Sequence, residues 1–145
     1  MTQAVVAAGS LAREARDEVV TMIERFMLAS MEGDRETVRK YMAPNVDVTF
    51  TGGRKFPLPE QIQAFNARRY GWVKKAIERY DVAVGQDETV VYCTGTLYGE
   101  WLDGVPFEGN RYVDRFVIVD GKIVKMDVWN DSAELMLRQA GLADE

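Results

Sequence analysis

Four long segments with strand-like patterning fill the second half of this sequence and constrain its fold most. Gln86-Asp87, Asp103-Gly104 and Asp120-Gly121 lie between successive segments. Asp-Gly pairs favour two-residue hairpin turns, because both residues tolerate positive φ. The sequence therefore predicts an antiparallel meander of four strands. The segments are WVKKAIERYDVAVG, ETVVYCTGTLYGEW, VPFEGNRYVDRFVIV and KIVKMDVWN.

Helical patterning dominates the first half of the chain. Apolar residues recur at helical spacing over residues 13–31, and Gly33 can end that helix. A short second helix closes at Pro44, and NVDVTFTGGRKF predicts a small hairpin at its Gly-Gly pair. A third helix follows the prolines of FPLPE, and a short helix follows the last strand. We expect an α+β fold in which three helices pack on a curved sheet and enclose an apolar pocket.

The length of 145 residues suits one domain. We expect a flexible tail over residues 1–12, the domain over 13–138 and a second tail over 139–145. The apolar runs are too short to span a membrane, and the start lacks the basic region of a signal peptide. The sequence predicts no membrane partner.

Charge and missing residue types exclude several functions. The net charge of −5 opposes binding to nucleic-acid phosphates, so the basic run ARRYGWVKKAIER is interpreted as a solvated face with local ion pairs. The chain has no histidine, which excludes Ser-His and Cys-His nucleophile pairs and ordinary histidine-ligated metals. We expect no metal and no cofactor. Cys93 is the single cysteine, which is consistent with a cytoplasmic protein.

Asp114 interrupts an apolar strand face. Tyr112 and Phe116 lie on the same face at period two, and a carboxylate buried there without a partner is costly. Two interpretations remain open. Asp114 is either a pocket-facing carboxyl, protonated near neutral pH and able to donate to a bound carbonyl or ether, or it forms an ion pair with Arg111 or Arg115 at a sheet edge.

The position of Asp127 depends on the register of the hairpin at residues 120–121. A tight two-residue turn would place Asp127 opposite Asp114, where the two carboxyls could form an acid–base pair. A three-residue turn with a glycine bulge would place Val128 there and turn Asp127 to the other face.

The order of elements, the phrase EGD after the first helix and the segment DRFVIVDGKIVKM resemble the nuclear transport factor 2-like superfamily over about residues 13–137. The likeness is greatest to SnoaL-like polyketide cyclases and ketosteroid isomerases. It implies a cone-shaped, cystatin-like fold and a homodimer formed through the outer sheet face. It also favours the register in which Val128 faces the pocket and Asp127 lies outside. The fold hosts isomerases, cyclases, dehydratases, epoxide hydrolases and non-enzymes.

Ketosteroid isomerases use an Asp base and an oxyanion hole of one Tyr and one protonated Asp. The resemblance places Phe26 at the tyrosine, Phe50 at the base and Asp114 at the protonated aspartic acid. Steroid isomerisation by that mechanism is therefore not expected. The added phenylalanines would make the pocket more apolar and raise the pKa of Asp114.

Two hypotheses for function follow. The first is a metal-free isomerase, cyclase or lyase that acts on a small hydrophobic carbonyl or polycyclic molecule. The second is a non-catalytic ligand-binding or assembly module. Arg54 is expected at the pocket rim, where it could meet an anionic group of a substrate. The candidate catalytic residues are Asp114, Tyr112 and Asp127, and the candidate ligand-binding residues are Phe26, Phe50, Met22, Phe65, Arg54 and Val128.

Overall fold

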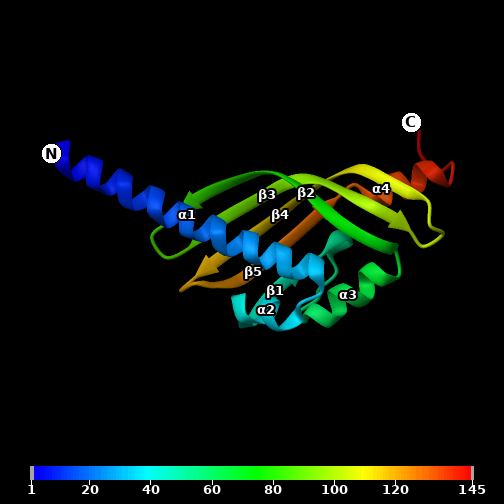
Figure 1. Ribbon diagram of the computed structural model, residues 1–145, viewed down its shortest axis with the longest axis horizontal. Coiled ribbons are helices and arrows are strands. Elements are labelled where there is room, and N and C mark those ends of the chain that lie inside the picture. Colours follow the sequence, from blue (N-terminus) through cyan, green and yellow to red (C-terminus); the bar gives the residue numbers. More distant parts are fainter. Residues whose placement is uncertain (1, 145) are drawn as a thin grey trace.

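The computed structural model describes residues 2–144, with side chains from residue 13 onward. It has the expected α+β architecture, in which helices pack on a strongly twisted sheet (Figure 1). In chain order, the elements are α1 Thr2–Glu32, α2 Arg35–Tyr41, β1 Met42–Thr49, the 3-10 turn η1 Thr51–Gly53, α3 Pro59–Ala67, β2 Tyr70–Val84, β3 Thr89–Trp101, β4 Pro106–Val119, β5 Lys122–Asn130 and α4 Ser132–Gln139.

The sheet has five strands in the order β1-β5-β4-β3-β2. Strands β2 to β5 form the antiparallel meander that the sequence predicts. The first strand differs from the prediction, because β1 pairs in parallel with β5 and extends the sheet. Only the bridge between Thr49 and Lys55 corresponds to the expected small hairpin. Between them Gly52 and Gly53 adopt φ of 72° and 77°, a region that favours glycine.

The turn between β4 and β5 combines features of both predicted registers. Asp120 and Gly121 form a two-residue turn with φ of 51° and 73°, as expected for an Asp-Gly pair. A β-bulge close to this turn then shifts the register by one residue. As a result, Val128 and not Asp127 lies opposite Asp114.

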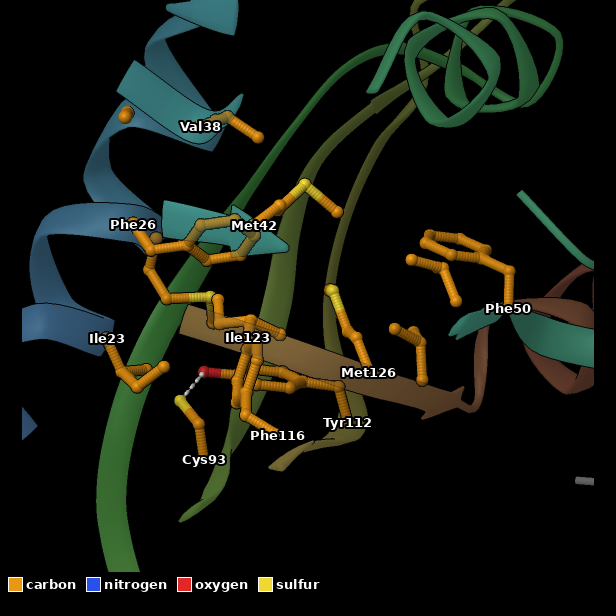
Figure 2. Close-up of a cluster of buried hydrophobic side chains, with 14 of the residues drawn as sticks. Ile23, Phe26, Val38, Met42, Phe50, Cys93, Tyr112, Phe116, Ile123 and Met126 are labelled. Atoms are coloured by element: carbon orange, nitrogen blue, oxygen red, sulfur yellow. Dashed lines mark hydrogen bonds between the residues drawn. The ribbon is translucent and has the colours of Figure 1, made fainter. Parts of the chain in front are cut away.

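Helices α1, α2 and α3 cover one face of the sheet, here called the inner face. The ring of Phe26 on α1 meets that of Phe116 on β4 edge-on, with ring centroids 5.6 Å apart. Cys93, Tyr112 and Met126 belong to the same buried cluster (Figure 2). The opposite face is here called the outer face, and none of the described helices packs on it in Figure 1. The helices thus bury the apolar side of every long strand and leave the other side accessible.

Both ends of the chain carry helices. Helix α1 begins at Thr2, within the segment expected as a tail, and its first turns extend beyond the sheet (Figure 1). Helix α4 follows the last strand, as predicted. Within the described residues, no helix is long and apolar enough to cross a membrane.

Candidate functional site

A cavity of about 110 Å³ lies between the inner face and helices α1 to α3. Most of its wall is apolar, and several side chains of this wall are drawn in Figure 2. The volume exceeds that of several ordered waters and suits a ligand of about one ring. The apolar wall includes Phe26, Met42, Phe50, Leu97, Met126 and Val128.

Asp114 lies in this wall and is fully buried. Its Oδ2 atom forms an ion pair with the Nζ atom of Lys75, whose side chain is 21% exposed. The sequence left open an ion pair of Asp114 with Arg111 or Arg115, but neither arginine is its partner. Arg111 pairs with Asp131, and Arg115 pairs with Asp127. The buried Oδ1 atom has no hydrogen-bond partner among the described residues. An unpaired carboxyl oxygen at a cavity wall can accept a hydrogen bond from a ligand.

Burial and the ion pair act on Asp114 in opposite directions. Burial raises the pKa of its carboxyl, and the charge and hydrogen bond of Lys75 lower it. The effect of burial is larger, so the pKa lies above its ordinary value of 3.8. This direction agrees with the expected rise, but the carboxyl has a cationic partner, Lys75, that the sequence does not predict.

The sequence predicts Lys75 on a solvated face, but in the structure its side chain turns to the cavity. It lies on β2, an edge strand, between Val73 and Ile77 on the same strand face. Its backbone N–H donates to the sulfur of Met31 on α1, at 3.3 Å. This period-two pattern of apolar neighbours was the sequence signal that could have identified Lys75.

Tyr112 lies beside the ion pair, and its ring centroid is 4.8 Å from Nζ of Lys75. Its hydroxyl lies 3.4 Å from the sulfur of buried Cys93, as the dashed line in Figure 2 shows. Burial raises the pKa of both the Tyr112 phenol and the Cys93 thiol. Tyr112 therefore presents its ring to the cavity and keeps its hydroxyl in the core, so it contributes a surface for Lys75 rather than the expected pocket hydroxyl.

Asp127 lies outside the cavity. It pairs with Arg115 in the strand register, and its Oδ2 atom lies 3.4 Å from Nη1 of Arg115. Because successive residues of a strand face opposite sides, its carboxyl is on the outer face and Val128 takes the cavity position. The possible acid–base pair of Asp114 and Asp127 does not form.

Three predicted ligand-binding residues also lie away from the cavity wall. Met22 lines a surface hollow beside the β2–β3 and β4–β5 turns. Phe65 packs against Phe50 with ring centroids 5.3 Å apart, outside the wall. Arg54 is exposed, donates to the carbonyl of Thr51 at 2.8 Å and has its guanidinium 5.1 Å from the centroid of the Phe65 ring. The other predictions for this group, Phe26, Phe50 and Val128, do line the cavity.

A buried polar network borders the cavity near the start of α4. The fully buried Oγ of Ser132 accepts hydrogen bonds from the Tyr70 hydroxyl at 2.6 Å and from the Asn110 side chain at 3.0 Å. The backbone N–H of Ser132 donates to the side chain of Asn130 at 3.1 Å. Tyr70 and Asn130 line the cavity, so this network fixes its wall to α4.

No group of three or more His, Cys, Asp or Glu side chains that could hold a metal occurs among the described residues. The ion pair of the cavity wall is Lys75–Asp114. A carboxyl with raised pKa next to an ammonium can exchange a proton with a ligand, and the ammonium can stabilise negative charge on an oxygen.

The fold and the cavity define the chain as an α+β protein with a nuclear transport factor 2-like fold. The sequence profile of the SnoaL-like domain matches residues 23–126, and the chain belongs to this family. Among curated proteins, none matches this sequence.

Solved structures with the same fold include three that bear on the expected resemblance. A candidate SnoaL-like polyketide cyclase from Jannaschia sp. shares 24% identity at a TM-score of 0.62, over 87% of this chain and 92% of that one. A candidate ketosteroid isomerase from Shewanella frigidimarina shares 16% sequence identity at a TM-score of 0.61, and the match covers 75% of this chain and 92% of that one. A nuclear transport factor 2-like protein with a cystatin-like fold, from Novosphingobium aromaticivorans, shares 17% sequence identity at a TM-score of 0.64. The match covers 85% of this chain and 86% of that one. These likenesses confirm the predicted fold.

Proposed function

We propose that this protein binds a small, mostly apolar carbonyl compound and transfers a proton to or from it. One observation carries the proposal: Asp114 is fully buried at the cavity wall, and its Oδ1 atom has no partner among the described residues. A buried polar atom without a partner is costly, and a ligand hydroxyl or acidic C–H would occupy that position.

In this proposal Asp114 is the base and Lys75 stabilises the developing oxyanion. The carboxylate takes a proton from the carbon next to the carbonyl, and the electron pair of the C–H bond moves to the oxygen as an enolate. The Lys75 ammonium donates a hydrogen bond to that oxygen. Protonated Asp114 then returns the proton to carbon, which gives isomerase chemistry, or to a leaving group, which gives lyase chemistry.

Phe26 and Phe50 support a second candidate, a non-catalytic ligand-binding module. Both line the cavity at positions where the resemblance implies a tyrosine and a base. An apolar wall at both positions leaves Lys75–Asp114 as the main polar centre. Such a site could hold a ligand without transforming it.

Deuterium exchange separates the two candidates. A simple aromatic ketone such as acetophenone would be incubated with the protein in heavy water, and NMR would follow exchange next to the carbonyl. We expect Asp114→Asn to slow exchange by about 100-fold or more, the usual contribution of a general base. The outer-face variant Thr96→Ala is the matched control. Binding without exchange would favour the second candidate, and the lack of both would refute the proposal.

We also propose a homodimer formed through the outer face. This face exposes large aromatic side chains, of which Trp72 is 44%, Tyr98 39% and Trp129 55% exposed. Exposed aromatic surface of this kind is typical of interaction sites. Light scattering on the purified protein should give twice the chain mass, and Trp129→Glu should give the monomer mass. A monomer at all concentrations in the unmodified protein would contradict the proposal.

A further inference from the structure

The cavity reaches the protein surface beside the first residue of α2. Arg35 and Ser30 line the cavity and are exposed, whereas Gln63 and Asn66 on α3 line it and are half-buried. The Nε atom of Arg35 donates to the side-chain oxygen of Gln63 at 2.5 Å. This bond joins α2 to α3 across the mouth and fixes one edge of the guanidinium group there.

Arg35 has no carboxylate partner among the side chains described for residues 13–144. Two carboxylates that could pair with Arg35, those of Asp34 and Glu60, already have other partners. Asp34 accepts from the backbone N–H of Thr37 at 3.1 Å and from its hydroxyl at 2.6 Å, and Glu60 pairs with Arg39. The terminal nitrogens of the Arg35 guanidinium are therefore available to a ligand.

The charge along the cavity wall is positive on balance. Asp114 is the one carboxylate among the described lining residues, and it is paired with Lys75. Lys74 also borders the cavity, but its side chain lies on the other strand face, so its charge faces away from the cavity. Arg35 thus adds an unbalanced positive charge at the mouth of a cavity in a protein whose net charge is −5.

We infer that the ligand of this cavity carries an acidic group, a carboxylate in the simplest case, at the end opposite its reacting carbonyl. The carbonyl end lies at Lys75–Asp114, the apolar body contacts the wall, and the acidic end pairs with Arg35 at the mouth. A guanidinium binds a planar carboxylate through two parallel hydrogen bonds, and Gln63 holds the group in place for this contact. The inference rests on the proposed function, because it assumes that the cavity binds a carbonyl compound.

Two probes of nearly equal size test the inference. 4-Acetylbenzoate carries a carboxylate opposite its ketone, and 4-acetylbenzamide carries a neutral amide at the same position. Their affinities would be measured by titration calorimetry or NMR at low salt, where charge pairing is least screened. In the unmodified protein we expect the acid to bind about ten-fold more tightly than the amide.

Variants then test whether Arg35 causes the preference for the acid over the amide. Arg35→Gln should weaken binding of the acid until the two affinities are close to equal. Arg39→Gln is the matched control, since Arg39 is on the same helix but pairs with Glu60 and does not line the cavity. Equal affinities in the unmodified protein, or a preference that survives Arg35→Gln, would overturn the inference while ketone binding stands. If neither probe bound, or if Lys75→Met left amide binding unchanged, the proposed function itself would fail, and this inference with it.

Discussion

The ammonium nitrogen of Lys75 lies over the ring of Tyr112, 4.8 Å from its centroid. The two residues come from β2 and β4, and β3 runs between these strands. On β3, Gly95 is the register partner of Tyr112, so no side chain separates the lysine from the ring at that point. The lysine can therefore cross β3 to reach both the ring and the carboxyl of Asp114, and the two contacts order a side chain that would otherwise be flexible.

Replacing Lys75 should strengthen the dependence of stability on pH that comes from Asp114. Lys75→Met leaves the buried carboxyl without its cation, which should lower the free energy of unfolding by about 3–5 kcal/mol near neutral pH. The pKa of Asp114 is already raised, and loss of the ammonium raises it further. The folded state then binds the proton more tightly than the unfolded state, so stability falls as pH rises from the ordinary value of 3.8 through the raised pKa.

Urea unfolding from about pH 5 to about pH 8 measures this dependence. Lys74→Met, on the outer face, is the control. In the double variant Lys75→Met/Asp114→Asn, the free energy of unfolding should lose the additional dependence on pH that Lys75→Met introduces. Equal stability and slope for the Lys75 and Lys74 variants would show that the ion pair contributes nothing.

Cys93 should be unreactive in the folded protein. It is fully buried, burial raises the pKa of its thiol, and its sulfur contacts the Tyr112 hydroxyl. Thiolate is the reactive form, so a maleimide should label Cys93 in denaturant but only slowly in native buffer. Mass spectrometry would follow the labelling. Rapid labelling of the native protein would mean that the core around Tyr112 opens readily.

Gly95→Ala should destabilise the sheet. A Cβ atom at this position would lie 2.1 Å from the carbonyl oxygen of Ala76 on β2, so the backbone of one strand would have to move. We expect a loss of about 1–3 kcal/mol in the free energy of unfolding. Thr96→Ala, the next residue and on the outer face, should change it by less than about 0.5 kcal/mol. Thermal unfolding followed by circular dichroism compares the two, and similar stabilities would contradict the close approach of β2 and β3.

Ser132→Ala should weaken the attachment of α4. The variant removes the acceptor for the buried Tyr70 hydroxyl and Asn110 side chain. Buried donors without partners should cost about 1–3 kcal/mol of stability. Ser30→Ala is the control, because Ser30 is exposed and should tolerate the change. Hydrogen exchange would locate the effect, which should appear at the start of α4, and uniform exchange in both variants would argue against it.

The meander was predictable because its signals are local. The pair Asp120-Gly121 specifies a two-residue turn from its own backbone preferences, and the structure has that turn. The bulge beside it left no comparable signal, so the turn alone did not decide whether Asp127 or Val128 faces the cavity. The parallel pairing of β1 with β5 depends on contacts between distant segments, and alternation in NVDVTF is equally compatible with a hairpin.

The candidate site was partly predictable for the same reason. Asp114 stood out because it interrupts a strongly apolar strand face, and its place in the cavity wall follows from that pattern. Lys75 has a weaker signal, since charged residues of the outer face alternate with Val73 and Ile77 around it. Arg35 reaches the mouth only because α2 packs beside α3, a tertiary contact that its sequence neighbours do not specify.

The parallel partnership of β1 and β5 has a consequence for the order of folding. Met42 pairs with Ile123, roughly 80 residues later in the chain, and closing so long a loop has an entropic cost that slows the search for native contacts. During synthesis β1 cannot form this pairing until the segment of β5 has left the ribosome. Because Met42 and Met126 both line the cavity, its wall can be completed only after β5 has been made, so a nascent chain lacks this cavity until then.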